Sequence, residues 1–398
     1  MKLDIAVIGL GVVGSGVCEV ADINRELIKS RAGADINVKY VVDIRDCEDS
    51  PYRHKLIKDF DIVLGDPDVR IVVEAIGGTR AAYDYSKKAL ASGRHVVTSN
   101  KELVAEKGYE LNQLAKTNNV SYLFEASVGG GIPVIRPLTR CLGANEIGSV
   151  YGILNGTTNY ILTKMTNEKA GFADTLKEAQ RLGYAEADPT ADVSGKDTLR
   201  KICILSSLAY GSHIYPEQAV CEGITDISAE DIECAAACGY KIKLLGLSKK
   251  LADGRVSGDR ISLLTAPHLV SRESPIYGVD DVFNGIVVNG NAVGEAMFYG
   301  RGAGKLPTAS AVWGDILDIA ERFDNPPRYE WEDEKPGLLV SGAEHESHWF
   351  VRFGAGVAIP AGLERAACGC AGISGSMPRA ALDQLITGAE VKAVLRVL

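Results

Sequence analysis

Short β-branched apolar runs alternate with amphipathic helical windows over the first third of the chain. The helical windows include Tyr83–Ser92 and Glu102–Thr117. The expected strands are Asp4–Ile8, Val38–Val42, Ile71–Ala75, His95–Thr98 and Tyr122–Glu125. Such alternation is typical of right-handed β–α–β crossovers, in which helices cover both faces of a parallel sheet. We therefore expect an α/β domain at the N-terminal end.

The pattern changes after Pro137. Three strand-like runs and three long helical windows follow, and they predict a second domain of the α+β type. The strand-like runs are Val150–Leu154, Ile261–Thr265 and Ile286–Val288, and the helical windows are Phe172–Arg181, Lys196–Tyr210 and Ala229–Leu247. A last helix over Ala309–Phe323 ends before Asn325-Pro326-Pro327, a strong helix-breaking sequence.

The length supports more than one domain. A single hydrophobic core usually stops growing at ~250–300 residues, and the chain has 398 residues. We place a first domain at residues 1–137, a second at 138–300, and a short tail rich in glycine and alanine at 337–398.

Composition excludes several classes of protein. The net charge is −9 and no long basic run is present, which argues against a protein that binds nucleic-acid phosphates. No apolar stretch approaches the ~20 residues that span a bilayer. The N-terminus lacks the basic start and cleavage site of a signal peptide. These features favour a cytoplasmic protein without membrane segments.

The cysteines favour a reducing compartment. Their number, nine, is odd, and most lie in apolar or helical stretches, which suits buried thiols better than a disulfide framework. Cys234 and Cys238 share a helix face, and Cys368 lies close to Cys370. Neither pair has a second pair or a histidine at zinc-finger spacing, so we interpret all four as structural thiols.

A glycine motif follows the first strand. Residues 9–14 read Gly-Leu-Gly-Val-Val-Gly, and this pattern between a strand and a helix is typical of a Rossmann-type turn that binds a dinucleotide pyrophosphate. The second strand ends at Asp43, farther from Gly14 than the usual ~20 residues. Asp43 can bind both ribose hydroxyls of NAD, whereas Arg45 can bind the 2′-phosphate of NADP. The sequence alone does not decide between NAD and NADP.

A second motif carries the candidate chemistry. Asp197 and Lys201 are four residues apart and share one helix face. A desolvated lysine oriented by a carboxylate can act as a general acid/base. On spacing alone a solvated salt bridge is the more common arrangement. The apolar residues 202–208 favour burial of the Asp197–Lys201 pair instead.

The residues around this pair suit an amino-acid substrate. Glu186, Asp188 and Asp192 concentrate negative charge in the preceding loop, which a substrate ammonium can balance. Upstream, Asn155-Gly-Thr-Thr-Asn159 offers backbone N–H groups and hydroxyls at an expected helix start, a suitable place for a substrate carboxylate.

These residues resemble homoserine dehydrogenase, and the resemblance covers residues 1 to about 322. Its most specific part is the long motif from Leu182 to Asp197. The other matching segments are Gly9–Gly14, Ser99–Lys101, Glu125–Pro133, Asn155–Tyr160, Gly300–Gly304 and Pro307–Ala311. The resemblance implies a Rossmann-type domain to which residues 301–323 return, a substrate-binding and dimerisation domain at 138–300, and a homodimer. It also implies the NAD(P)-dependent interconversion of L-homoserine and L-aspartate 4-semialdehyde, in the biosynthesis of threonine, methionine and isoleucine.

The resemblance also assigns roles to residues. Lys201 would be the general acid/base and Asp197 its partner. The substrate would contact Glu186, Asp192, Tyr184, Gly156, Thr157 and Lys101. The cofactor would contact Gly9, Leu10, Gly11, Val12, Val13, Gly14, Asp43, Arg45, Asn100, Lys101 and Gly302. A monovalent cation, usually sodium, would bind the carbonyl groups of Glu125, Val128, Gly130 and Ile132.

The chain departs from the family pattern at two places. Val42 precedes Asp43, where members that prefer NADP often carry arginine or lysine. The tail is shorter than a complete regulatory ACT domain and resembles it only faintly, in His348–Phe353 and Cys370–Ser374. Feedback control by threonine is therefore in doubt.

Two other functions are less well supported. A nucleotide-sensing regulator without turnover would need a DNA-binding module, and no basic helix-turn-helix pattern is present. An aspartate-semialdehyde dehydrogenase would need a nucleophilic cysteine with a histidine base, and no cysteine has such a context.

Overall fold

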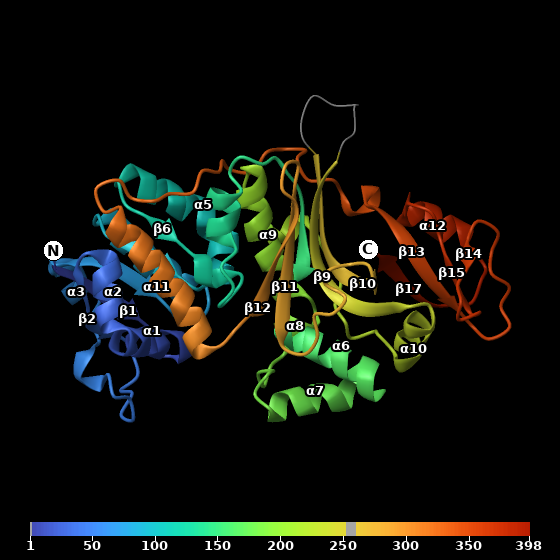
Figure 1. The fold of residues 1–398 in the computed structure, drawn as a ribbon, viewed down its shortest axis with the longest axis horizontal. Coiled ribbons are helices and arrows are strands. Elements are labelled where there is room, and N and C mark those ends of the chain that lie inside the picture. The colour runs from blue at the N-terminus through green and yellow to red at the C-terminus, as the bar shows by residue number, and fades with distance from the viewer. Residues whose placement is uncertain (1, 252–259) are drawn as a thin grey trace. The chain divides into compact units, whose positions relative to one another are not determined.

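The computed structural model describes residues 2–251 and 260–398, and it divides into two compact units (Figure 1). The first unit comprises Met1–Ala144, Ile204–His213 and Arg301–Asp333. The second comprises Asn145–Cys203, Ile214–Gly300 and Glu334–Leu398. Each unit is described by itself.

The first unit contains a six-stranded parallel sheet in the order β3-β2-β1-β4-β5-β6. The strands are β1 (Lys2–Ile8), β2 (Asp35–Val42), β3 (Leu56–Ile57), β4 (Val69–Glu74), β5 (His95–Thr98) and β6 (Tyr122–Leu123). This order is that of the Rossmann fold, in which ligands bind where the strand order reverses, here between β1 and β4. The predicted α/β class is confirmed.

Helices cover this sheet because its central strands are apolar on both faces (Figure 1). Helix α1 packs against α11 and α4 packs against α5, and the Trp313 indole on α11 donates a hydrogen bond of 2.9 Å to the carbonyl of Val17 on α1. The helices are α1 (Val12–Ile23), α2 (Arg25–Ala32), α3 (Asp61–Gly65), α4 (Arg80–Ala91), α5 (Lys101–Thr117) and α11 (Lys305–Glu321), with short turns η1 (Arg53–Lys55), η2 (Glu125–Ser127) and η3 (Pro137–Cys141).

The second unit is built on an 11-stranded mixed sheet. Its main path is β12-β11-β7-β9-β10-β17-β13-β15-β14, and β8 and β16 pair with β10 and β13. The strands are β7 (Ile147–Ile153), β8 (Val220–Cys221), β9 (Tyr240–Leu251), β10 (Arg260–Ser271), β11 (Phe283–Gly290), β12 (Gly294–Arg301), β13 (Glu346–Phe353), β14 (Glu364–Arg365), β15 (Ala371–Ile373), β16 (Met377–Pro378) and β17 (Val391–Val397).

Helices α6 and α10 pack on strand β9 of this sheet, and α7 packs on α6. Their apolar faces share one core with Phe350 and Leu395 of the tail. The helices and turns of this unit are α6 (Gly156–Glu168), α7 (Phe172–Arg181), α8 (Thr190–Val193), α10 (Ala229–Ala237), α12 (Arg379–Leu385), η4 (Pro216–Gln218) and η5 (Gly342–Glu344). Helix α9 (Lys196–Tyr210) begins in the second unit, and its residues from Ile204 onward belong to the first. In the described part of the chain, no helix is long and apolar enough to cross a membrane.

One expected helix is wrong. The window Ala229–Leu247 contains helix α10 only as far as Ala237, and the rest belongs to strand β9. Gly239 ends the helix with φ +83°, a left-handed conformation that favours glycine after a helix. Buried positions follow one another along β9, so the strand lacks the alternation that distinguishes a half-buried strand from a helix.

Candidate functional site

The glycine motif forms a tight turn between β1 and α1. Gly9 has φ +94°, and Gly11 is the N-cap of α1, whose first residues are Val12 and Val13. A Cβ atom on Gly14 would lie 1.8 Å from the Gly9 carbonyl oxygen, whereas a Cβ on Gly11 would meet nothing within 4 Å. Gly14 thus allows the strand and helix to approach, and Gly11 leaves space beside the helix N-terminus for a phosphate.

Asp43 lies beside this turn. Its carboxylate accepts hydrogen bonds from the Leu10 N–H (2.8 Å) and from the Arg45 backbone N–H (2.9 Å). The Arg45 guanidinium donates two more, at 3.0 and 2.7 Å. The guanidinium and then the backbone donors outweigh burial and hold the pKa of Asp43 well below its usual range. A permanent carboxylate therefore lies at the expected ribose position.

Asn100 connects the loops that follow β4 and β5. As N-cap of α5 it accepts from the Leu103 N–H (3.1 Å), and its amide donates to the Gly78 carbonyl (2.7 Å). Lys101 is the first residue of α5 and is half-buried. Asn100 and Lys101 thus lie at the carboxyl edge of the parallel sheet, where ligands bind in this fold.

The sequence interpretation missed Glu74, the last residue of β4. Its carboxyl group is buried and accepts hydrogen bonds from the Thr98 hydroxyl and the Ile76 N–H. Burial raises the pKa of Glu74 to about 7, although these hydrogen bonds act to lower it. A charged residue directly after the apolar run Ile71–Val73 was the signal that could have identified it.

The glycine-rich bend after β6 surrounds a second buried carboxylate. Glu125 accepts hydrogen bonds of 2.7 Å from the backbone N–H groups of Val134, Ile135 and Arg136. Its own N–H donates to Asp315 (2.8 Å), which also pairs with the Arg136 guanidinium at 2.9 Å. Burial and the charge of Glu125 raise the pKa of Asp315 to about 8. No local sequence pattern indicated Asp315 or Arg136, because their partners are distant along the chain.

The same bend contacts the segment that includes Gly302. The Gly131 N–H donates to the Arg301 carbonyl (3.1 Å), and a Cβ on Gly130 would lie 2.2 Å from the Gly302 carbonyl oxygen. Val128, Gly130 and Ile132 are buried, and within the described residues their carbonyl oxygens accept no backbone hydrogen bond. Unpaired buried carbonyl groups of this kind can hold a cation.

In the second unit, Lys201 and Asp197 form a buried pair. The Lys201 ammonium donates to Asp197 Oδ2 and to the Leu154 carbonyl, each at 2.8 Å. Their side chains are 10% and 3% exposed, so the pair is not the solvated salt bridge that the spacing alone allows. Lys196, on the same helix, is exposed.

Asn155 links this pair to the loop before α9. It is the N-cap of α6, and its amide donates to Asp192 Oδ1 (2.7 Å) and Asp197 Oδ2 (2.9 Å). The side-chain Oδ1 of Asn155 accepts a hydrogen bond from the Thr158 N–H at 2.8 Å. The sequence analysis assigned backbone N–H groups and hydroxyls to this helix start and gave the Asn155 side chain no role. One side chain therefore fixes two candidate carboxylates at once.

The remaining candidate substrate residues line the start of α6 and the following loop. The Thr157 hydroxyl donates to the Tyr184 carbonyl at 2.6 Å. A Cβ on Gly156 would lie 2.8 Å from the Val282 carbonyl oxygen, so only glycine fits there. Tyr184 and Glu186 are exposed, and both follow the Gly183 turn.

Comparison with known proteins identifies the family. The family model described as "Homoserine dehydrogenase, NAD binding domain" matches residues 9–125, and the "Homoserine dehydrogenase" model matches residues 133–317. A homoserine dehydrogenase of Synechocystis is 44% identical over 343 residues, which cover 85% of this chain and 76% of that protein. One from Helicobacter pylori is 45% identical over 322 residues, 81% of this chain and 74% of that protein.

Solved structures agree with this result. The homoserine dehydrogenase of Thiobacillus denitrificans matches with a TM-score of 0.90 at 33% identity and covers 100% of this chain and 98% of that one. A mutant of a hyperthermophilic archaeal homoserine dehydrogenase in complex with NADPH matches with a TM-score of 0.68 at 28% identity, covering 82% and 99%. The chain therefore belongs to the homoserine dehydrogenase family of NAD(P)-dependent oxidoreductases.

Proposed function

We propose that Lys201 is the general acid/base that moves the proton between the enzyme and the substrate oxygen. Its burial beside Asp197 is the observation that carries this assignment. An ammonium has three N–H donors. In the described part of the chain, two of these N–H groups donate hydrogen bonds to the Asp197 carboxylate and the Leu154 carbonyl. The third can therefore donate to the oxygen of L-aspartate 4-semialdehyde.

A nicotinamide held by the first unit would supply a hydride to the aldehyde carbon or take it from the alcohol carbon. As the aldehyde is reduced, Lys201 donates a proton to the oxygen and becomes neutral. In the reverse direction, neutral Lys201 takes the hydroxyl proton of L-homoserine. Asp197 orients Nζ in both directions, and Asn155 keeps the Asp197 carboxylate in place.

We assign the substrate's charged ends to two groups of residues. Glu186 and Asp192 would bind its ammonium, with Tyr184 covering it. Gly156 and Thr157 would bind its carboxylate, because the N-terminus of α6 presents backbone N–H groups. The Asn155–Asp192 hydrogen bond supports this placement, since it fixes Asp192 beside that helix start.

We assign the cofactor to the first unit. Leu10, Val12, Val13 and the glycine turn would hold its pyrophosphate, and Asp43 with Arg45 its adenosine ribose. Asn100, Lys101 and Gly302 would lie along the nicotinamide end. The parallel sheet edge and the space beside Gly11 support this assignment.

We further propose a sodium ion at the bend after β6. The carbonyl groups of Glu125, Val128, Gly130 and Ile132 would hold it, and hard oxygen donors suit such an ion. The buried carbonyl groups without hydrogen bonds support the fit. The ion would stiffen the bend that contacts the Gly302 segment.

We propose a cytoplasmic homodimer. In support, all nine cysteines are free of disulfides, as expected in a reducing compartment. One face of the second unit's sheet carries a hollow of about 910 Å³, lined in part by the partly exposed Tyr151 and Leu247. A second subunit could cover these apolar residues, and light scattering of the purified protein would test it.

The decisive experiment replaces Lys201. Lys201→Met keeps the side-chain length and removes the proton-transfer group, so kcat should fall by about 10²–10⁴-fold while NAD(P)H binding stays near wild type. Asp197→Asn should also impair turnover. The matched control is Lys196→Met, which changes an exposed lysine of the same helix and should leave kcat unchanged.

A Lys201→Met variant that retains more than about a tenth of wild-type kcat would contradict the assignment. Lys201 would then be a structural ion-pair residue. Lys101 would become the next candidate for the acid/base.

A further inference from the structure

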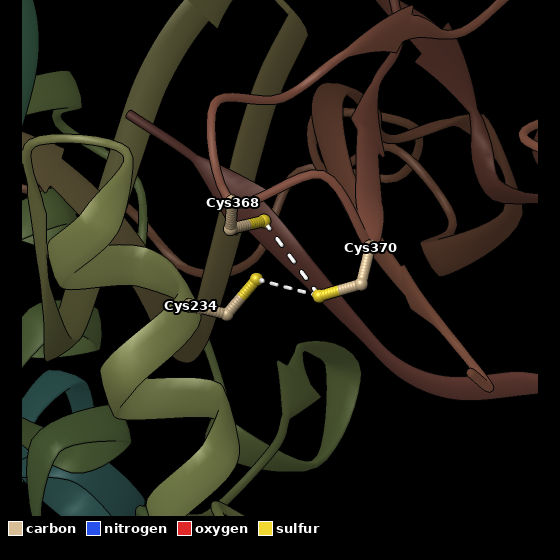
Figure 2. Close-up of side chains that lie close together, drawn as sticks. All are labelled: Cys234, Cys368 and Cys370. Atoms are coloured by element: carbon tan, nitrogen blue, oxygen red, sulfur yellow. Dashed lines mark hydrogen bonds between the residues drawn. The ribbon is translucent and has the colours of Figure 1, made fainter. Parts of the chain in front are cut away.

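Cysteines from two distant segments meet in the second unit. The Sγ atom of Cys234 lies 3.6 Å from that of Cys370, and Cys370 Sγ lies 3.9 Å from Cys368 Sγ (Figure 2). The three sulfur atoms all lie within 4.8 Å of one another. Sequence spacing did not predict this meeting, because Cys234 and Cys370 are far apart along the chain.

A fourth thiol lies on the same face of helix α10. Cys238 is the C-cap of α10, one helical turn after Cys234, and its sulfur atom lies outside the group of three that are all within 4.8 Å of one another. Residues at i and i+4 of a helix project from the same face. Helix α10 therefore presents both of its thiols to the segment 368–370.

The opposite side is a tight turn that directs two thiols inward. The Ala366 N–H donates to the Ala371 carbonyl and the Gly369 N–H to the Ala366 carbonyl, each at 2.9 Å. Gly369 has φ +78°, which glycine adopts without strain. This turn joins β14 to β15 and places Cys368 and Cys370 on the side that faces α10 (Figure 2).

The spacing of the sulfur atoms suits a tetrahedral metal site. Zinc–thiolate bonds of ~2.3 Å in a tetrahedron separate neighbouring sulfur atoms by roughly 3.8 Å. The observed separations of 3.6 and 3.9 Å lie on either side of this value. A disulfide would need ~2.05 Å. Soft thiolate ligands select zinc over magnesium or calcium.

We propose that Cys234, Cys368 and Cys370 bind one structural zinc ion, and that the Cys238 side chain turns toward it as the fourth ligand. Binding replaces four S–H bonds with four Zn–S bonds and releases four protons to solvent, with no change of oxidation state. Four protein ligands fill the coordination sphere, so the site offers no position for a substrate. It is separate from the Lys201 chemistry and does not depend on that assignment.

The ion would fasten the tail to the body of the second unit. Helix α10 already contacts strand β13 near its first turn, where Arg352 pairs with buried Asp231 at 2.7 Å. Zinc at the other end would join α10 to the β14–β15 turn. Cys234, Ala366 and Ala371 belong to one hydrophobic core, so the metal would secure a region that is already packed.

The test is the metal content of the full-length protein. Purified without chelator, it should contain about one zinc per chain by plasma mass spectrometry. Cys370→Ser, at an exposed ligand, should lose most of it. Cys141→Ser, at an exposed cysteine outside the cluster, should keep it. Wild-type protein that holds no zinc after incubation with zinc chloride and desalting, or that holds iron instead, would overturn the proposal.

A second measurement does not need the variants to fold. Native wild-type protein should show four thiols that resist a thiol reagent until a strong chelator is added, and its melting temperature should fall after chelation. Intact-mass and peptide analysis should detect no disulfide among the four cysteines. Thiol reactivity unaffected by the chelator, or a Cys234–Cys370 disulfide in the isolated protein, would show that the cluster is not a metal site.

Discussion

At the scale of single residues, we expect Asp43 to set which nicotinamide cofactor the first unit prefers. The Leu10 N–H and the Arg45 guanidinium both hold its carboxylate, and the resulting low pKa keeps it charged across the working pH range. A fixed negative charge attracts the ribose hydroxyls of NAD and repels the 2′-phosphate of NADP. Arg45 can reverse this preference only by leaving Asp43, and its side chain is 61% exposed.

We expect NADH to be used at least as well as NADPH. The measurement is kcat/KM for both cofactors with aspartate semialdehyde, where a tenfold difference equals about 1.4 kcal/mol. Arg45→Ala should leave the NADH value nearly unchanged. A strong preference for NADPH that this substitution abolishes would show that Arg45 binds the 2′-phosphate.

Glu74 should make stability depend on pH. Because burial raises the pKa of its carboxyl group to about 7, the folded protein retains a proton that the unfolded chain releases near ~4.3. This contribution is complete below the unfolded pKa and is lost as pH rises through the folded pKa. The loss between pH 4.5 and pH 7.5 is on the order of 3 kcal/mol.

Glu74→Gln should remove that loss, since glutamine mimics the protonated carboxyl group. Melting curves without cofactor should show the variant gaining stability relative to wild type as pH rises from 5 to 8. Glu330→Gln, at a side chain that is 80% exposed, is the control and should follow the wild type. Equal pH dependence in wild type and Glu74→Gln would mean that Glu74 is already ionised at pH 5.

At the scale of elements, two glycines of the turn between β1 and α1 should affect different properties. Gly14 should affect the stability of the fold, and Gly11 should affect only cofactor binding. Gly14→Ala places a Cβ 1.8 Å from the Gly9 carbonyl, so β1 and α1 must move apart and the melting temperature should fall together with NADH affinity. Gly11→Ala meets nothing within 4 Å and should keep the melting temperature. Its methyl group should still weaken NADH binding at least tenfold, because it lies where the pyrophosphate is expected.

Calorimetric titration and thermal melting would distinguish the two glycine variants. If both lost stability equally, the turn would be a structural feature with no specific place for a phosphate. If Gly11→Ala bound NADH normally, the pyrophosphate would lie elsewhere.

Periodicity predicted most of the first unit because its parallel strands are apolar runs bounded by turns. The strands β1, β4 and β5 and the helices α4 and α5 lie at the predicted places with small shifts at their ends. It failed over Ala229–Leu247, where a helix and a strand buried on both faces follow each other directly. Burial on both faces removes the period that would have separated them.

The candidate site shows the same limit. The i,i+4 spacing predicted the Asp197–Lys201 contact because both residues lie on one helix. It could not predict that Asn155 joins Asp192 to Asp197, or that Cys234 meets Cys370. Those contacts depend on how distant segments fold together, which local patterns do not contain.

At the scale of the whole molecule, the tail forms part of the second unit's sheet. Strand β17 pairs in parallel with β10 through His268–Arg396 and Leu269–Val397, and β13 follows it in the sheet. Phe350 and Leu395 of the tail are buried in the same core as α6 and α10. Loss of the tail would therefore expose a sheet edge and part of this core.

This arrangement bears on feedback control by threonine. An effector regulates an enzyme only if it binds two states of the protein with different affinity, and the pairing of β17 with β10 leaves the tail little freedom to move as a separate body. We therefore expect L-threonine at millimolar concentration to change kcat/KM by less than the ~5-fold at the lower end of typical allosteric coupling. The measurement is initial rate against L-threonine concentration, with D-threonine as the matched control. Sigmoidal inhibition by the L-isomer alone would show that the short tail does form an effector site.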